Sequence, residues 1–502
     1  MTPIDKGPVR FGEVSVHTNV ALDRSEAAIS IISELEAGAP TAAVIAAEIT
    51  QSGFPVASVE DPITLFPKGT SLVQSAAIPR PQLWYPNGGG ASPLYQARLA
   101  IRARDGGIVD RAAKEFGIRD VAAGPGGEIS VNGRRVWVQG WSWNAGMAPE
   151  RYDRVLALAR DSGANLLNVT GGVETEAFYD LCDRFGLMVW QEVRSPGDIQ
   201  PRLLSHPSLI AWGTPVNEPA LAEELRTAAQ LEDPQRLWLP AGAAPFAEAE
   251  GPHADHTARH GEIMHALGVQ RAIETARGQQ DRVPGVMAGR LPASGRPTPV
   301  YYAAKRAYRP FHVSASFRTV SWAGEAVFSS EVWLHNHSVP RPLLNAVATV
   351  LDLQGRELYQ ENLAGEGSEN SSECIGDLYW RFPGGFAAPF VLMLEVIDEE
   401  GETVARNAYQ HSRAPEPAFV PLIEAPSTTL EVERCGAGVS IRNTGTALAL
   451  GIQVKAERAL IEDSDFPLPP GAQREIRLSD PAAPVDVRAW NAAAAPGGLL
   501  EP

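Results

Sequence analysis

The stretch from Arg151 to Val193 alternates helix and strand patterns, and it decides the fold class. RYDRVLALARDSG (151–163) has the apolar spacing of an amphipathic helix that ends at a glycine, and NLLNVT (165–170) has the composition of a short buried strand. ETEAFYDLCDRFG (174–186) repeats the helix pattern, and LMVWQEV (187–193) repeats the strand pattern. Strands that alternate with helices of this length predict βα units and a parallel sheet or barrel.

Outside this stretch the chain changes to β patterns on both sides. Short alternating segments before residue 118 predict a small β-sandwich, and the turn-rich segment 123–127 predicts a linker after it. From Phe311 onward, AVATVLDLQGRELYQE (346–361) and FVLMLEVIDEEGETVARNAY (390–409) each have the pattern strand, Asp-x-x-Gly, strand. We therefore expect four parts: a β-sandwich over 1–123, a βα domain over 128–310, a β-sandwich over 311–414 and a small β-sandwich over 415–502.

Composition and charge exclude several classes of protein. The 502 residues carry a formal net charge of -17, which argues against a nucleic acid or an anionic membrane surface as the main partner. The three cysteines lie far apart, so neither a disulfide framework nor a cysteine zinc site is expected. No apolar run reaches the roughly 18 residues that a membrane span needs. The start, MTPIDKGPVRFGEV, lacks a signal-peptide pattern, so the expectation is a cytoplasmic protein.

The strongest chemical signal lies in HPSLIAWGTPVNE (206–218), where an apolar strand leads to a carboxylate. In βα barrels the carboxyl ends of the strands face the active site, so Glu218 is a candidate general acid. The alternative is structural. Pro219 suits the first position of a helix, and a carboxylate next to it favours the helix dipole.

A set of segments in a fixed order resembles glycoside hydrolase family 2, in particular its β-mannosidase and exo-β-glucosaminidase-like branch. The segments are PQLWYPN (81–87), LY (94–95), KEFGIR (114–119), VNGRRVW (131–137), GWSW (140–143), FYDLCD (178–183), VWQE (189–192), HPSL (206–209), NE (217–218), PVYYAAKRAY (299–308) and SDFPLPPG (464–471). They extend over nearly the whole chain, and they are specific as a set rather than singly.

The resemblance implies an immunoglobulin-like β-sandwich before a TIM barrel, with further β-sandwiches after it. It also implies retaining hydrolysis by two glutamates, with Glu218 as the acid/base and Asn217 as a contact to a sugar hydroxyl. Two of the chain's departures from the family concern its domains. It starts without the jelly-roll domain, and its barrel region has about 180 residues, whereas an eightfold barrel typically has about 250. The expected fold is thus a reduced TIM barrel flanked by β-sandwiches.

The second carboxylate is less well marked in the sequence. The nearest equivalent of the family's nucleophile segment is FAEAEG (246–251), where alignment of the glycine places Ala249 at the nucleophile position. Glu248 and Glu250 on either side are the candidates, and Glu262 is a third. The alternative is that these glutamates belong to a solvated loop.

Aromatic residues at the ends of the predicted strands are candidate sugar contacts. The resemblance and the strand positions favour Trp143, Trp141, Trp212 and Glu192 as substrate contacts, and Trp190 has a similar position. The alternative for each tryptophan is core filling. Asn168 lies where the family usually has a cation and an aromatic residue.

Histidines and an aspartate gather at His253, Asp255, His256 and His260, a spacing that can bind zinc on a helix. No helix is evident there and the resemblance implies no metal, so we expect a polar loop, no metal and no cofactor. Two functions stay open. One is a retaining, exo-acting β-glycosidase with a carbohydrate substrate, and the other is an inactive relative that serves as a glycan-binding or scaffold protein. Self-association, or a partner domain in place of the jelly roll, fits either function.

Overall fold

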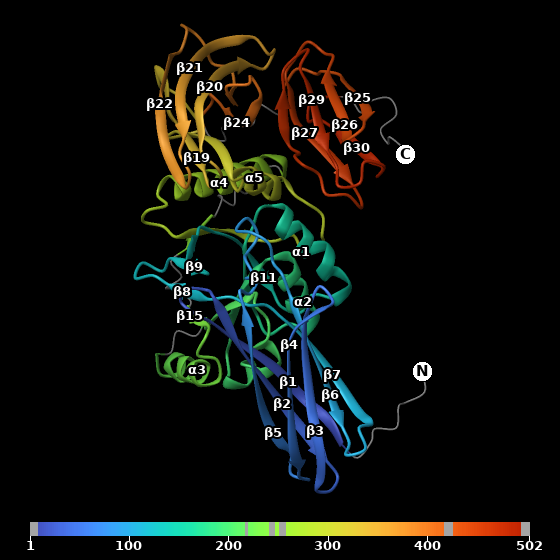
Figure 1. Ribbon diagram of the computed structural model, residues 1–502. Coiled ribbons are helices and arrows are strands. Elements are labelled where there is room, and N and C mark those ends of the chain that lie inside the picture. The colour runs from blue at the N-terminus through green and yellow to red at the C-terminus, as the bar shows by residue number, and fades with distance from the viewer. Residues whose placement is uncertain (1–8, 216–218, 240–245, 250–257, 416–424, 493–502) are drawn as a thin grey trace. The chain divides into compact units, whose positions relative to one another are not determined.

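The computed structural model describes residues 9–215, 219–239, 246–249, 258–415 and 425–492, with side chains from residue 261 onward in the fourth range. The chain divides into two compact units (Figure 1). The first comprises Met1–Arg160, Ala164–Phe246 and Ala293–Gly295, and the second comprises Asp161–Gly163, Ala247–Pro292 and Arg296–Pro502.

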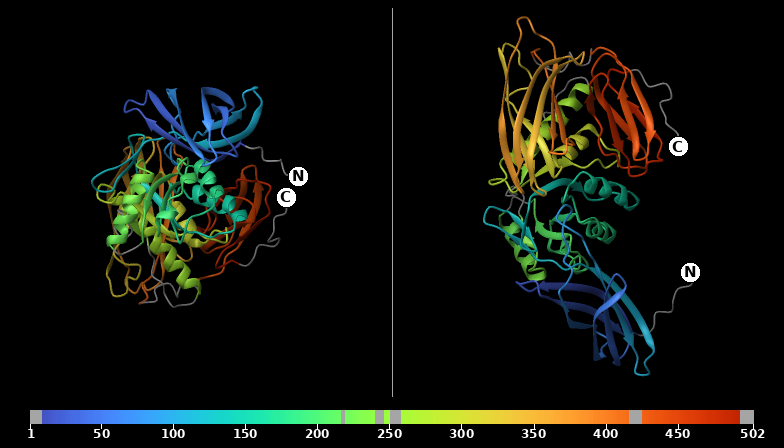
Figure 2. Two further views of the ribbon diagram at one scale, coloured as in Figure 1. Left: turned by 90° about the horizontal axis from the view of Figure 1, so that it is seen from below. Right: turned by 45° about the horizontal axis from the view of Figure 1, so that its top comes forward.

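The first unit begins with a sandwich of two antiparallel sheets (Figure 2). One sheet has the order β1-β2-β5, and the other has the order β4-β3-β6-β7. Their strands are β1 (Val9–Val20), β2 (Glu26–Ala37), β3 (Thr41–Gln51), β4 (Phe54–Leu65), β5 (Thr70–Pro79), β6 (Tyr95–Arg102) and β7 (Ile108–Phe116). Alternate residues of β2 and β6 are buried, as the period of a half-buried strand requires.

A small antiparallel sheet follows the sandwich, with β8 (Val121–Ala123), β9 (Ile129–Val131) and β10 (Arg134–Val136) in the order β10-β9-β8. The segment 123–127, predicted as a linker, includes the turn between β8 and β9. The N–H of Gly124 donates to the carbonyl of Glu128, and Gly127 has a φ of 84°, a conformation that favours glycine. Turn-rich composition is common to linkers and hairpin turns, so it could not distinguish them.

The rest of the first unit is a parallel sheet with the order β15-β14-β13-β12-β11 (Figure 1). Its strands are β11 (Val138–Asn144), β12 (Leu166–Thr170), β13 (Met188–Glu192), β14 (Leu209–Gly213) and β15 (Leu237–Trp238). The helices between them are α1 (Tyr152–Asp161), α2 (Glu176–Phe185) and α3 (Pro219–Glu232). Both helices predicted between 151 and 186 are therefore present. Gly186 ends α2 at a φ of 70°, and its N–H donates to the carbonyl of Cys182.

The parallel sheet is reduced in the way that the sequence predicts. Between β13 and β14 there is no α-helix in the described chain, and the connection contains two 3₁₀ turns, η2 (Pro196–Asp198) and η3 (Pro201–Leu203). β15 has two residues, Leu237 and Trp238.

The second unit begins with two short parallel strands and two helices. β16 (Ala247–Glu248) pairs with β17 (Gly285–Arg290), and α4 (Ala258–Gly278) and α5 (Pro299–Ala307) accompany them. α4 includes the amphipathic segment HALGVQRAIETAR (265–277). Its side chain Glu274 is buried and accepts hydrogen bonds from Asn407 and Tyr409, which fixes α4 to the sandwich that follows.

Two antiparallel sheets form that sandwich, with the orders β18-β19-β22 and β21-β20-β23-β24. The strands are β18 (Phe311–Ser316), β19 (Val327–Asn336), β20 (Arg341–Asp352), β21 (Glu357–Gly367), β22 (Ser371–Arg381), β23 (Phe390–Ile397) and β24 (Thr403–His411). Both predicted hairpins are present. In each turn an aspartate, Asp352 or Asp398, accepts backbone N–H groups, and a glycine with positive φ, Gly355 or Gly401, follows three residues later.

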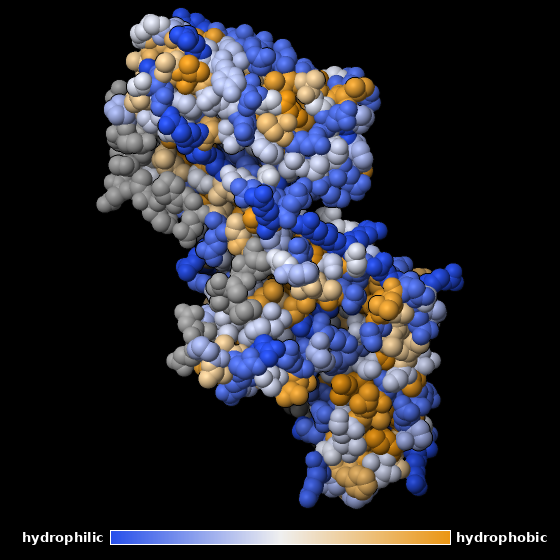
Figure 3. Space-filling view, turned by 90° about the vertical axis from the view of Figure 1, so that its left-hand side faces the viewer, coloured by the Kyte–Doolittle hydropathy of each residue, from blue (hydrophilic) through white to orange (hydrophobic). Residues whose placement is uncertain are grey.

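The chain ends in a small sandwich with the sheets β25-β26-β29 and β28-β27-β30. Its strands are β25 (Leu430–Cys435), β26 (Gly438–Asn443), β27 (Ala449–Ala456), β28 (Phe466–Leu468), β29 (Gln473–Arg477) and β30 (Val485–Arg488). In the described residues of either unit, no helix has both the length and the apolar character to cross a membrane. The face in Figure 3 mixes hydrophilic and hydrophobic residues. Exposed apolar side chains of the first sandwich include Phe54, Phe66 and Val73.

Candidate active site

Strand alternation divides the side chains of the parallel sheet into two sets, one on each face. Trp143 on β11 identifies the face that the helices cover. Its ring centroid lies 6.0 Å from that of Tyr152 on α1 and 4.8 Å from that of Phe178 on α2. Trp141 lies two residues earlier on the same strand, so it projects toward the same side, and both tryptophans are buried.

Three aromatic side chains on the helix-covered side donate to buried carboxylates. The Trp143 indole N–H donates to Glu174 Oε1 at 2.9 Å, and the Tyr152 hydroxyl donates to Glu174 Oε2 at 2.6 Å. On β14 the Trp212 indole N–H donates to Asp233 Oδ2 at 2.9 Å. Both carboxylates are buried, so each indole completes a satisfied pair.

The opposite, concave face carries Asn168 on β12 together with Trp190 and Glu192 on β13. Gln191, between the last two, accepts a hydrogen bond from the hydroxyl of Tyr179 on α2, so its neighbours in the strand point away from the helices. The sheet register places Asn168 beside Trp190, which brings these side chains together. We call Asn168, Trp190 and Glu192 the concave cluster.

The concave cluster lies toward the carboxyl ends of its strands, where barrel enzymes carry their active sites. Burial raises the pKa of Glu192 above its ordinary value, and the hydrogen bond from Asn168 and the charge of Arg194 offset this effect only in part. A carboxyl group of this kind keeps its proton to a higher pH than a free glutamate and can hydrogen-bond a sugar hydroxyl.

Two polar atoms of the concave cluster are buried without a hydrogen-bond partner among the described residues. They are the Oδ1 atom of Asn168 and the Nε1 atom of Trp190. Gly213 on β14 leaves room for the indole, because a Cβ at this position would lie 2.4 Å from Trp190 Nε1 and 2.1 Å from the carbonyl oxygen of Leu239. Among the described residues, the concave cluster thus has one acceptor and one donor that no protein group pairs.

The catalytic candidates are described only in part. Three of them lie outside the described residues: Asn217 and Glu218, which precede α3 in the sequence, and Glu250, which follows β16. Glu248 is exposed on β16 and Glu262 is exposed on α4, both in the second unit. Their predicted catalytic roles, and the sugar-contact roles of Trp141, Trp143, Trp212 and Glu192, stay predictions.

The predicted histidine cluster is also outside the description, since His253, Asp255 and His256 and the side chain of His260 are not described. A different group, Asp180, Asp183 and His206, comes together among the described residues. His206 Nδ1 lies 2.7 Å from Asp183 Oδ2, and Asp183 Oδ1 accepts the N–H of Ser208. These bonds connect α2 to the segment just before β14. They lie at the amino end of the parallel strands, whereas Glu192 lies at the carboxyl end of β13. The buried histidine therefore has a structural role.

Comparison with known proteins relates part of the chain to a family of enzymes. Residues 9–119 match the model of the glycosyl hydrolases of family 2. The chain is related to the family 2 glycosyl hydrolases. Part of the chain is 32% identical over 152 residues to a mannosylglycoprotein endo-β-mannosidase of Lilium longiflorum, covering 28% of this chain and 15% of that protein. Part of it is likewise 28% identical over 202 residues to an exo-β-D-glucosaminidase of Hypocrea virens, covering 38% of this chain and 23% of that protein.

Solved structures show the same fold as this family 2 relative. A β-D-mannosidase from Dictyoglomus thermophilum superimposes with a TM-score of 0.77 at 18% identity, over 97% of this chain and 77% of that chain. An exo-chitosanase from Amycolatopsis orientalis superimposes with a TM-score of 0.78 at 15% identity, over 97% of this chain and 79% of that chain. The predicted fold class, a reduced TIM barrel with β-sandwich domains, is confirmed.

The structure places two residues in the concave cluster that the sequence did not assign to the site. Asn168 was predicted only as a departure from the family, and Trp190 was not favoured over Trp141, Trp143 and Trp212. Strand alternation alone shows that Trp190 and Glu192 share a face of the sheet, and that Trp141 and Trp143 share a face. It does not say which of these faces the helices cover. The contacts with α1 and α2 were needed to decide which face the helices cover.

Proposed function

We propose that the chain is an exo-acting β-glycosidase that retains the anomeric configuration, with Glu218 as its acid/base and a β-mannoside or β-glucosaminide as its substrate. The concave cluster carries the proposal, because it offers a buried carboxyl group and unpartnered polar atoms toward the carboxyl ends of β12 and β13. The family relationship supports the same reaction class. The aligned region spans 15% and 23% of the length of the two curated relatives, so their activities come to this chain as proposals.

In the proposed reaction, Glu218 donates a proton to the glycosidic oxygen while a second carboxylate forms a bond to the anomeric carbon, and the aglycone departs as an alcohol. Glu218 then takes a proton from a water molecule. The oxygen of that water displaces the carboxylate, and the sugar leaves with its original configuration. The sequence offers Glu248 and Glu250 for the second carboxylate.

The concave cluster supplies binding rather than bond cleavage in this proposal. The Asn168 amide oxygen accepts a hydrogen bond from a sugar hydroxyl, and the Trp190 indole N–H donates one to a sugar oxygen. Glu192 holds another hydroxyl at the end of β13. A substrate that pairs these atoms recovers the free energy that their burial costs the empty site.

The decisive experiment is hydrolysis of a panel of aryl β-glycosides (mannoside, glucosaminide, galactoside and glucuronide) by the full chain. Glu218→Gln keeps the shape of the side chain but removes its proton, and we expect a loss of turnover of about 10²–10⁴-fold. Glu224→Gln on the exposed side of α3 is the matched control and should retain full activity.

Turnover of one glycoside that disappears in Glu218→Gln and persists in Glu224→Gln would establish the enzyme and name the sugar. Parallel tests of Glu248→Gln and Glu250→Gln, with azide added to restore activity, would then identify the nucleophile. Absence of turnover in a folded chain would favour the inactive, glycan-binding relative instead.

A further inference from the structure

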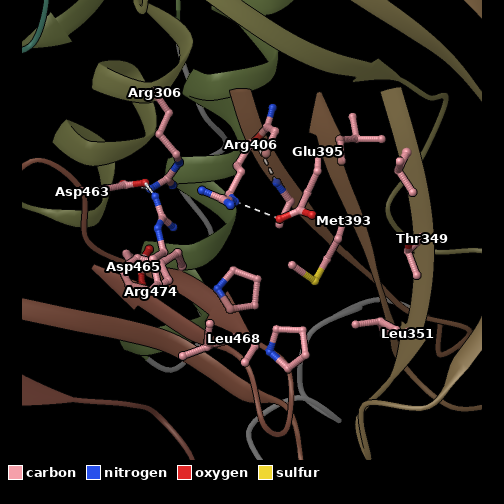
Figure 4. A pocket seen from close by; sticks show the side chains of 18 of the residues that line it. Arg306, Thr349, Leu351, Met393, Glu395, Arg406, Asp463, Asp465, Leu468 and Arg474 are labelled. Carbon is pink, nitrogen blue, oxygen red and sulfur yellow. Dashed lines mark hydrogen bonds and ion pairs between the residues drawn. The ribbon is translucent and has the colours of Figure 1, made fainter. Parts of the chain in front are cut away.

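A cavity of about 320 Å³ lies within the second unit (Figure 4). One wall is the outer face of the sheet β21-β20-β23-β24, and the other is the segment between Asp463 and Arg474, which includes β28. The sheet register places Thr349 on β20 beside Met393 on β23, and both line the cavity. A cavity of this size is at the lower end of the range for small-molecule sites.

The floor of the cavity is apolar. Leu351 and Met393 contribute from the sheet, and Pro467, Leu468 and Pro469 contribute from the opposite wall. Prolines and aliphatic side chains present C–H groups with little conformational freedom, so a ligand face made of C–H groups packs well against them.

The arginines that line the cavity are already paired. Arg306 Nη1 lies 2.9 Å from Asp463 Oδ1, and Arg474 Nη2 lies 2.6 Å from Asp463 Oδ2. Arg406 pairs with Glu395 at 2.8 Å on the exposed side of the cavity. With Asp465 the lining has three cationic and three acidic side chains, which balance in formal charge. This balance favours a ligand without net charge.

Asp465 differs from the other charged residues, because its Oδ1 atom is buried and has no hydrogen-bond partner among the described residues. The backbone holds this residue at a φ of 63°, with its N–H donating to the carbonyl of Ile452 at 2.6 Å. Burial raises the pKa of Asp465 to about 6, with the charges of Asp463 and Glu262 adding to the increase and that of Arg306 opposing it. An unpartnered buried carboxyl destabilises the empty protein, and a ligand that donates a hydrogen bond removes this cost.

We propose that this cavity is a second carbohydrate site, which takes a neutral mono- or disaccharide with one hydroxyl donated to Asp465 Oδ1 and a C–H face on Met393 and Leu468. A sugar meets all three requirements of the cavity. It has no net charge, it has hydroxyl donors, and its ring has apolar faces. The site does not depend on hydrolysis, so its success or failure is independent of the function proposed above.

Methionine methyl NMR of the full chain tests this site directly, because Met393 is one of six methionines and lines the cavity. The probes are D-mannose, D-glucosamine, D-galactose and D-glucuronate, none of which has a glycosidic bond to hydrolyse. Met393→Leu assigns the resonance. We expect saturable shifts of the Met393 methyl with at least one neutral sugar and a weaker response to the anionic glucuronate.

Two variants examine the contacts. Asp465→Asn tolerates the same backbone conformation and removes the charge of the side chain. It should weaken sugar binding about fivefold, because a neutral hydrogen bond is weaker than one to a charged group. Thr349→Trp fills the cavity and should abolish the response. Glu475→Gln, exposed on β29 next to Arg474, is the control and should bind normally.

A Met393 methyl that does not move with any neutral sugar at saturating concentration overturns the proposal, whatever the other methionines do. A shift that persists in Thr349→Trp also overturns it, because the sugar would then bind elsewhere. A response to cyclohexylammonium with none to neutral sugars would identify an amine site instead and would equally reject the carbohydrate.

Discussion

The two faces of the parallel sheet carry tryptophans of equal burial but different hydrogen bonding. On the helix-covered face, the indole N–H groups of Trp143 and Trp212 each donate to a buried carboxylate. On the concave face, the Trp190 N–H has no partner among the described residues, and the nearby Asn168 Oδ1 has none either. Burial is therefore a poor guide to role in this sheet. Among these three tryptophans, hydrogen bonding of the indole N–H differs where burial does not.

The strongest test of this comparison is Glu174→Ala. Glu174 accepts from the Trp143 indole, the Tyr152 hydroxyl and the Gly146 N–H, so its removal leaves three donors without their acceptor. We expect the free energy of unfolding to fall by about 3–5 kcal/mol, measured by urea denaturation.

The exposed Glu150→Ala is the matched control and should change stability by less than about 0.5 kcal/mol. Glu174→Gln, which keeps one acceptor oxygen, should lie between the two. Equal stabilities of Glu174→Ala and Glu150→Ala would contradict the structural role given to the helix-covered face.

The same substitution on the two faces gives the second test. Trp212→Phe leaves Asp233 Oδ2 without its indole donor, whereas Trp190→Phe removes an N–H that has no described acceptor. Both changes remove the same atoms, so the cavity cost is similar. We expect Trp212→Phe to lose about 1–3 kcal/mol more stability than Trp190→Phe, measured by paired urea unfolding curves. A larger loss for Trp190→Phe would reverse the assignment of the faces.

The smallest expected effect is a pH dependence at Glu192. Since burial raises its pKa in the folded chain, the native state holds this proton at pH values where the unfolded chain has lost it. This contribution to stability is present at low pH and disappears as the pH rises through the folded pKa. Glu192→Gln should therefore gain stability relative to the parent as the pH rises, measured by urea midpoints between pH 4.5 and 8.

Glu176 provides a control of opposite sign. Burial alone would raise its pKa, but the hydrogen bond and charge of Lys114 outweigh burial, and the pKa is lowered. Its contribution to stability is lost as the pH falls through the folded pKa. Glu176→Gln should therefore lose stability relative to the parent as the pH rises toward the ordinary glutamate pKa of about 4.3, so its urea midpoints are measured from about pH 3 upward. The same pH slope in both variants would refute the difference in environment between the two glutamates.

Local rules predicted most of the fold from the sequence. Apolar spacing and a glycine at position 186 gave α2, and the Asp-x-x-Gly pattern gave the hairpins at Asp352 and Asp398. Errors occurred where one composition suits two structures. The glycines of 123–127, predicted as part of a linker, form part of the hairpin turn between β8 and β9.

The candidate site could be predicted less completely. Residue type and strand position led to Trp143, Trp212 and Glu192, and alternation could have grouped Trp190 with Glu192. No local pattern contains the partners that decide between a structural and a binding role. Glu174 lies 31 residues from Trp143, its hydrogen-bond donor, and Asp233 lies 21 residues from Trp212. Only the fold brings each pair together.

Gly213 has a consequence for the sequences that this fold can tolerate. Any side chain at this position would collide through its first carbon with the Trp190 indole and with the backbone of Leu239, and backbone cannot move aside as a flexible side chain can. In a saturation library selected for folded protein, position 213 should accept glycine almost exclusively. A second substitution that shrinks Trp190 should not widen that choice, because the carbonyl of Leu239 remains.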